Sequence, residues 1–139
     1  MKQGILLFGL AGLLFFTNGC KKDSSSSIQG VWELRQAKGM VLVNYPPGNG
    51  KKIKFEGNHY EMSDNGQITQ NGTFVIVLDG SAAESTCTGI PAGKYRRRII
   101  YDNSTPNKKI FLEIGVNKLS FISGCFAYDA GSETEYARL

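Results

Sequence analysis

The sequence contains a single histidine, His59, among its 139 residues. No second His or Cys stands at a spacing from it that would bind a metal ion, and one histidine at a predicted turn gives no basis for a Ser–His–Asp arrangement. The phosphate-binding pattern Gly-x-x-x-x-Gly-Lys followed by Ser or Thr does not occur either. We therefore expect no metal, no cofactor and no enzyme activity.

Apolar runs long enough to cross a membrane are also lacking. The longest, Ile5 to Phe16, has about 12 residues, whereas a membrane-spanning helix needs roughly 20. The run follows Met1-Lys2 and has the length of the apolar region of a signal peptide. The alternative, a buried core helix, would not normally lie at the extreme N-terminus and be followed by a serine tract.

The residues after this run resemble the processing site of bacterial lipoproteins. Gly19-Cys20 is similar to the end of a lipobox, and Cys20-Lys21-Lys22-Asp23 followed by Ser24 to Ser27 looks like the mature start of many Bacteroidetes-type lipoproteins. Thr17 stands where a lipobox has Leu, which leaves cleavage without lipid as the alternative. The resemblance implies a cleaved signal peptide over 1–19, a diacylglycerol- and palmitate-bearing Cys20, and a flexible tether over 20–28. It also implies that the membrane is a partner, and that the protein lies at the outer membrane on its periplasmic or surface-exposed face.

Charge and cysteine content fit an exported domain. The formal net charge of +4 is too mild to indicate nucleic acid as a partner. Apart from Cys20, the chain holds Cys87 and Cys125, an even pair in an oxidising location, so we expect a disulfide between them. Two buried free thiols are the alternative. Residues 29–139 are long enough for one domain with a single core, which we expect to be a monomer.

Helical periodicity is nearly absent after residue 30, and short alternating stretches separated by Gly, Asn and Asp take its place. We expect Gly30 to Val43 to form one strand with a bend near Gly39. Asn71-Gly72 predicts a bulge or a turn, and Asp79 to Gly93 predicts a long irregular loop. The remaining expected strands centre on residues 53–55, 60–62, 68–78, 95–101, 110–114, 119–121 and 133–139. About eight strands joined in sequence order predict an all-β, antiparallel up-and-down barrel.

Four short segments resemble small bacterial lipocalin-like lipoproteins. They are Gly30-Val31-Trp32 at the start of the first strand, Ile53-Lys54-Phe55 through Tyr60, Asn71-Gly72-Thr73-Phe74, and Tyr136-Ala137-Arg138-Leu139 at the end. The resemblance spans most of residues 28–139 and implies a lipocalin-like barrel. It also implies that Arg138 stacks on Trp32 and closes the barrel floor, a structural role. No helix packed outside the barrel, as larger lipocalins have, is expected.

A ligand site is predicted around the basic run that begins at Tyr95. Arg97 shares one strand face with Tyr95, Ile99 and Tyr101. If Ile99 faces the core, Arg97 points into the barrel or its mouth and suits an anionic head group. If Ile100 faces inward instead, Arg97 lies in solvent.

Two functions follow from this barrel. One is a module that holds a small hydrophobic or amphipathic ligand in an open cavity reached past Tyr95, Arg97 and Tyr101. The other is a filled barrel that acts as a protein-interaction or inhibitor module, with an ordered 79–93 loop pinned by Cys87.

Overall fold

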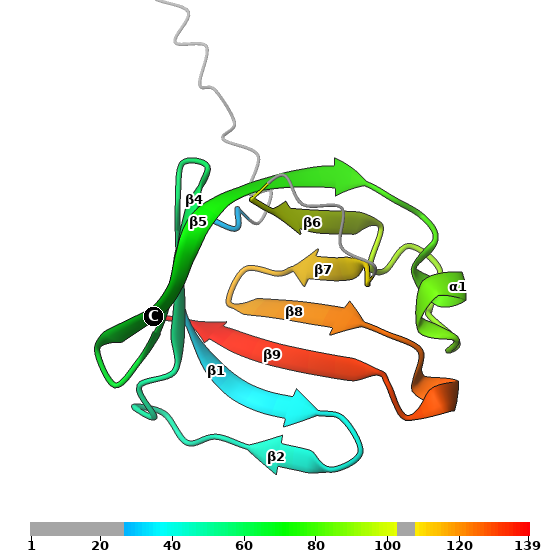
Figure 1. Cartoon of the computed structure of the whole chain (residues 1–139), viewed down its shortest axis with the longest axis horizontal. Coiled ribbons are helices and arrows are strands. Elements are labelled where there is room, and N and C mark those ends of the chain that lie inside the picture. Colours follow the sequence, from blue (N-terminus) through cyan, green and yellow to red (C-terminus); the bar gives the residue numbers. More distant parts are fainter. Residues whose placement is uncertain (1–26, 103–107) are drawn as a thin grey trace, which may run out of the picture.

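The computed structural model describes residues 27–102 and 108–139, so the predicted signal peptide, the lipid-bearing Cys20 and most of the tether lie outside the described residues. In these described residues, the chain forms nine strands and two short helical turns (Figure 1). In chain order they are β1 (Gly30–Lys38), β2 (Leu42–Asn44), β3 (Lys52–Glu56), β4 (His59–Asp64), β5 (Gln67–Leu78), α1 (Ala82–Thr86), β6 (Arg97–Tyr101), β7 (Ile110–Ile114), β8 (Lys118–Ser123), η1 (Phe126–Tyr128) and β9 (Ser132–Arg138).

The strands form one antiparallel sheet that closes into a barrel. Their order is β2-β1-β3-β4-β5-β6-β7-β8-β9, and β1 also pairs with β9, which joins the two ends. Eight strands make the wall, while β2 lies beside the second half of β1 as an extra strand. The predicted all-β, eight-stranded barrel is therefore confirmed.

The chain from Gly30 to Val43 is not one bent strand, as the sequence predicts, but a hairpin. Lys38 faces Leu42 across it, and the N–H of Gly39 donates to the carbonyl of Val41 at 3.1 Å. The prediction is wrong because apolar residues run through the turn without a break, so the pattern does not mark where the chain reverses. After the hairpin, the chain at Pro46 and Pro47 does not pair with β1, and β3 then pairs with the first half of β1.

The ladder also continues straight through Asn71-Gly72, where a bulge or turn is predicted. The irregularity lies instead between the pairs Met62–Gln70 and Ser63–Ile68. Glycine at position 72 is explained by a close contact instead, because a Cβ there would lie 1.9 Å from a carboxylate oxygen of Asp102. That carboxylate accepts hydrogen bonds from Thr73 N–H at 2.8 Å and from the Tyr60 hydroxyl at 3.0 Å.

Two apolar clusters lie on opposite sides of the wall. The larger fills the barrel and contains Ile28, Trp32, Ile53, Phe55, Tyr60, Phe74, Ile99, Leu112, Ile114, Leu119 and Phe121. The smaller lies outside and contains Ala82, Tyr95, Phe111 and Ile122. It exists because the segment between β5 and β6, predicted as an irregular loop, carries α1 and packs back on the outer wall. Over the described residues, no helix has the length and apolar character to cross a membrane.

Candidate functional site

Trp32 and Arg138 face each other across the pairing of β1 with β9. The guanidinium carbon of Arg138 lies 4.1 Å from the centroid of the Trp32 ring, within the distance of a cation–π contact. Arg138 also donates to the carbonyls of Gln29 at 2.7 Å, Ser27 at 2.6 Å and Val116 at 2.9 Å. The structure thus brings together the pair predicted from the sequence, and its contacts tie the start of the domain to the β7–β8 turn.

The interior of the barrel holds little free space. A hollow of about 170 Å³ remains, lined by Ile53, Met62, Tyr101, Ile110, Phe121, Ser123, Ser132, Thr134 and Tyr136. Tyr101 lies against Tyr60 with ring centroids 4.5 Å apart, and its burial raises the pKa of its hydroxyl. Pockets for small molecules usually measure roughly 300–1,000 Å³. The interior hollow is therefore smaller than a usual small-molecule site.

The three residues predicted to line one ligand site do not converge. Tyr101 lines the interior hollow, whereas Tyr95 is buried in the cluster outside the wall. Tyr95 has a φ of 51° and precedes β6, so the strand alternation that would align it with Arg97 is broken. Ile99 does face the core, but the Arg97 side chain is exposed.

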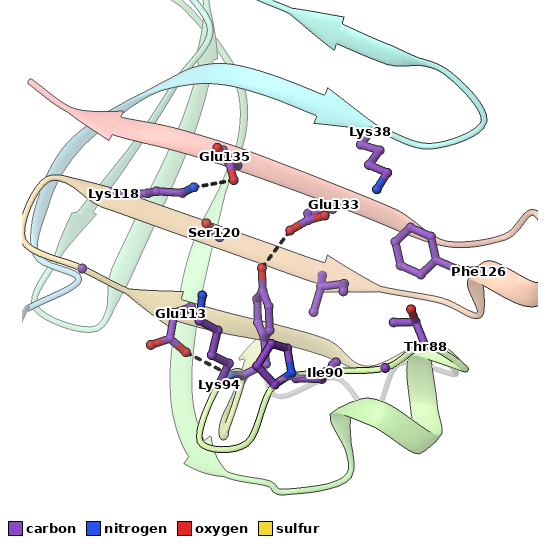
Figure 2. Close-up of a pocket in the computed structure, with 15 residues that line it drawn as sticks. Lys38, Thr88, Ile90, Lys94, Glu113, Lys118, Ser120, Phe126, Glu133 and Glu135 are labelled. Carbon is purple, nitrogen blue, oxygen red and sulfur yellow. Dashed lines mark hydrogen bonds and ion pairs between the residues drawn. The ribbon is translucent and has the colours of Figure 1, made fainter.

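A hollow larger than the interior one lies outside the barrel, between the chain at residues 88–95 and the outer wall (Figure 2). We call it the outer groove. It has a volume of about 440 Å³ and is lined by Lys38, Thr88, Gly89, Ile90, Pro91, Lys94, Tyr95, Glu113, Gly115, Lys118, Ser120, Ile122, Phe126, Glu133 and Glu135. Of the predicted site residues it contains Tyr95 alone.

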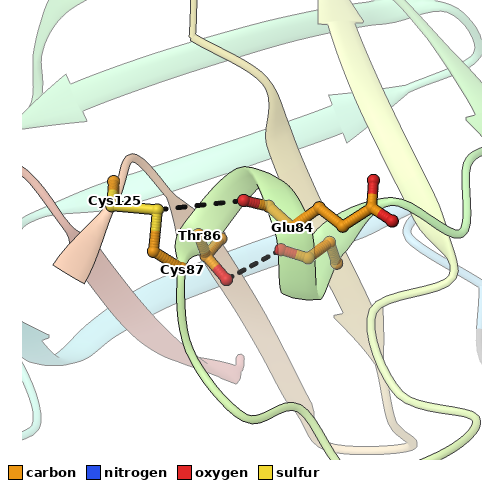
Figure 3. The surroundings of a disulfide bond; sticks show 5 residues. Glu84, Thr86, Cys87 and Cys125 are labelled. Atoms are coloured by element: carbon orange, nitrogen blue, oxygen red, sulfur yellow. Dashed lines mark hydrogen bonds between the residues drawn. A yellow bond between two sulfur atoms is a disulfide. The ribbon is translucent and has the colours of Figure 1, made fainter. Parts of the chain in front are cut away.

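The segment that covers the outer groove is fixed at both ends. At one end, a disulfide joins Cys87 to Cys125, with Cα atoms 4.9 Å apart, and links it to the β8–β9 connection (Figure 3). At the other end, the Glu113 carboxylate accepts a hydrogen bond from Tyr95 N–H at 2.9 Å. The Tyr95 hydroxyl donates to Glu133 at 3.0 Å. Burial and the nearby Glu133 charge raise the pKa of Tyr95, so its hydroxyl stays protonated and able to donate.

Asp79 fixes the start of the same segment, just after β5. Its carboxylate accepts from the N–H and hydroxyl of Ser81 and from Lys109 Nζ at 3.0 Å, and Arg98 Nε lies 3.5 Å away. These contacts, the Ser81 hydrogen bonds first, lower the pKa of Asp79 to about 2 against the opposing effect of burial. From this anchor α1 leads into the disulfide, and Ala82 packs on Phe111 and Ile122.

The outer groove is lined by both charged and apolar side chains. Glu113, Ser120 and Glu135 lie in one row across β7, β8 and β9, and Lys118 pairs with Glu135 at 2.5 Å. Ser120 forms the floor of this row and is 4% exposed. In Figure 2, Lys118 and Glu135 lie toward one end and Phe126 toward the other. Ile90 and Ile122 complete the apolar lining.

Sequence reasoning missed this site, although one signal for it was present. The strand residues Ile110, Phe111 and Leu112 are apolar on both faces, as are Phe121 and Ile122 on the next strand. A strand with apolar residues on both faces is covered on both sides. The outward-facing Phe111 and Ile122 therefore indicated that some segment packs on this part of the wall.

His59 lies exposed at the start of β4, away from the outer groove. Over residues 27–102 and 108–139, no group of three or more His, Cys, Asp or Glu side chains could hold a metal ion. Comparison of the chain with protein-family models, with curated proteins and with solved structures finds no match. Only the geometry of the site therefore bears on function.

Proposed function

We propose that this protein is an envelope lipoprotein, anchored through Cys20, whose barrel binds a small amphipathic ligand without catalysis. The observation that carries the proposal is the outer groove, whose volume of about 440 Å³ exceeds that of the interior hollow. Its size falls in the usual range for small-molecule sites, roughly 300–1,000 Å³. The proposed ligand site therefore lies on the outer face of the barrel, whereas the sequence predicts a site inside it.

The lining specifies the chemistry of the ligand. Ile90, Ile122 and Phe126 offer an apolar surface, which suits a hydrocarbon or ring portion. The row of Glu113, Ser120 and Glu135 can accept hydrogen bonds, and Lys94 and Lys118 can donate them. A ligand with an apolar body and a head that both donates and accepts hydrogen bonds would match this mixed lining.

Preorganisation of the cover supports binding. The disulfide and the two Tyr95 hydrogen bonds hold the covering segment in place before any ligand arrives. A preformed site avoids the entropic cost of ordering a loop on binding. The lipid anchor and the outer-membrane location are part of the proposal and rest on the N-terminal residues 1–28 of the sequence.

Native mass spectrometry of the full chain, purified from its own host with its processing intact, tests this proposal. We expect one small molecule per chain, and we expect its fragmentation to reveal an apolar part and an ionic or strongly polar head. A chain that carries its lipid and no other bound mass would contradict the proposal.

A further inference from the structure

The disulfide joins two segments that both line the outer groove. Cys87 ends α1 and Cys125 directly precedes η1. Four lining residues, Thr88, Gly89, Ile90 and Pro91, follow Cys87 in the chain, and the lining residue Phe126 follows Cys125. The bond between the two sulfur atoms therefore holds both segments in place (Figure 3). We call residues 88–94 the cover.

The cover has few other contacts that hold it against the wall. In the described part of the chain, its backbone hydrogen bonds run from Thr88 N–H to Ala83 of α1 at 3.4 Å and from Lys94 N–H to a carbonyl within the cover at 3.1 Å. Neither bond reaches a strand. Ile90 packs on the apolar cluster outside the wall, and Tyr95 holds the far end. Without the disulfide, the cover would keep only these two attachments.

The barrel itself is built without the cover. Among the described residues, the cluster that fills the barrel takes none from 79–95 or 124–131. The wall closes through the pairing of β1 with β9. The cover can therefore move away from the wall while the barrel stays folded.

The disulfide is accessible to a reductant. Cys87 is exposed and Cys125 is half-buried. A second hollow, of about 440 Å³, is lined by Ser85, Lys108, Lys109, Gly124, Cys125 and Ala130. A Cβ on Gly124, the residue before Cys125, would lie 2.8 Å from Lys108 Nζ, so this ammonium group lies close to the chain at the bridge.

Lys108 is a cation whose charge is not neutralised by a carboxylate. Lys109 pairs with Asp79, whereas Lys108 Nζ donates to a backbone carbonyl at 3.1 Å and has no carboxylate partner among the described residues. In thiol–disulfide exchange, a nearby cation stabilises the thiolate that leaves. Exposure thus directs attack to Cys87, and Lys108 favours the departure of Cys125.

We propose that the disulfide is a redox gate, which a dithiol oxidoreductase of the cell envelope opens to release the ligand of the outer groove. A thiolate of that enzyme bonds to Cys87 Sγ, and Cys125 Sγ leaves as a thiolate. The enzyme's second thiol then displaces Cys87. Two electrons pass to the bridge, the enzyme's dithiol becomes a disulfide, and each cysteine takes up one of the two protons that the dithiol gives up. The cover and Phe126 then separate, which opens the outer groove.

This inference rests on the proposed function, but reduction of the full chain with dithiothreitol tests the gate without reference to a ligand. Trp32 is the only tryptophan and lies fully buried inside the barrel, so its fluorescence reports whether the barrel is folded. We expect reduced protein to keep the fluorescence of a buried tryptophan, while the amides of the cover exchange with solvent about tenfold faster or more. Exposure of Trp32 on reduction, or unchanged exchange in the cover, would overturn the proposal.

Lys108→Gln tests the chemistry of opening, and Lys52→Gln on β3 is the matched control for the same change of charge elsewhere. We expect dithiothreitol to reduce Lys108→Gln about threefold more slowly than the parent chain and Lys52→Gln at the parent rate. Equal rates in the two variants would contradict the role given to Lys108.

The redox state in the host shows whether the gate is used. Cells are quenched with acid, and free thiols of the full chain are labelled with a maleimide mass tag. We expect growing cells to contain both the oxidised and the reduced chain. A chain that is entirely oxidised there would overturn the proposal.

Native mass spectrometry before and after reduction separates the gate from the proposed function. We expect the small molecule that is purified with the oxidised chain to be absent from the reduced, folded chain. Retention of that mass after reduction would contradict the gate and leave the binding function in place. A chain without a bound mass in either state would contradict the binding function, and the release step of the gate with it.

Discussion

Glu33 lies on β1 with its side chain turned to the outside of the barrel, yet the residue is 1% exposed. The loop between β2 and β3 covers it. Its carboxylate accepts hydrogen bonds from Gly48 N–H at 2.9 Å and Gly50 N–H at 3.4 Å, and it pairs with Arg35. These bonds lower the pKa of Glu33 despite its burial. The buried Glu33 carboxylate thus provides hydrogen-bond acceptors for two backbone N–H groups in the segment where the prolines interrupt strand pairing.

Glu33→Ala should therefore lower the free energy of unfolding by about 3 kcal/mol, because it leaves two backbone N–H groups and an arginine without their acceptor. Chemical denaturation at pH 7 measures the loss. Glu56→Ala is the control, since Glu56 pairs with Lys54 on the exposed surface, where solvent screens the pair and it contributes little to stability. Equal losses in the two variants would contradict the role given to Glu33.

Asp79 makes stability depend on pH in the acid range. Its pKa is lowered to about 2, below its ordinary value, so its stabilising effect is full above about pH 4 and is lost as the pH falls through about 2. We expect Asp79→Asn to cost on the order of 2 kcal/mol at pH 7 and much less at pH 2. Unfolding of both proteins by denaturant at the two pH values measures the difference.

Asp129 provides the control for this pH effect, because it is exposed at the end of η1 and has a φ of 54°, which asparagine tolerates. Asp129→Asn should leave the free energy of unfolding unchanged at both pH values. A cost of Asp79→Asn that is the same at pH 7 and pH 2 would exclude the ionised carboxylate as the source of stability.

Among the elements, the strands with apolar residues on alternate positions are those that the sequence predicts correctly. Ile53 and Phe55 in β3, and Ile110 and Leu112 in β7, face the core as expected. The reversal at Gly39 was missed because the exposed tip is as apolar as the strands beside it. The outer groove was missed because its cover forms through contacts between residues far apart in the chain, such as Tyr95 with Glu133.

The disulfide between Cys87 and Cys125 links two segments that are 38 residues apart in the chain. In the chain-entropy description, closing a loop of this length stabilises the folded state by about 4 kcal/mol. We expect the double variant Cys87→Ser, Cys125→Ser to lose a free energy of unfolding of that order, measured by denaturant titration. We also expect faster hydrogen exchange at residues 88–94. Reduced and alkylated wild-type protein should behave like the double variant, and an unchanged midpoint in either would contradict a stabilising bridge.

At the scale of the whole molecule, the barrel interior is filled mainly by the protein's own side chains. Aromatic side chains such as Phe55, Phe74 and Phe121 fill its interior. The Arg138 guanidinium lies against the buried Trp32 ring where β1 pairs with β9. The larger hollow is built on the outside by a covering segment that the disulfide and Tyr95 hold against the wall.

We propose that the ligand lies in the outer groove and not inside the barrel, and two matched serine variants distinguish these two locations. Ser120→Leu puts a larger side chain on the groove floor, and Ser132→Leu puts the same one into the interior hollow. Native mass spectrometry of both variants from the host compares the bound small molecule, with thermal midpoints as the check on folding. We expect Ser120→Leu to lose the bound mass and Ser132→Leu to retain it. Retention in Ser120→Leu together with loss in Ser132→Leu would contradict the account and place the ligand inside the barrel.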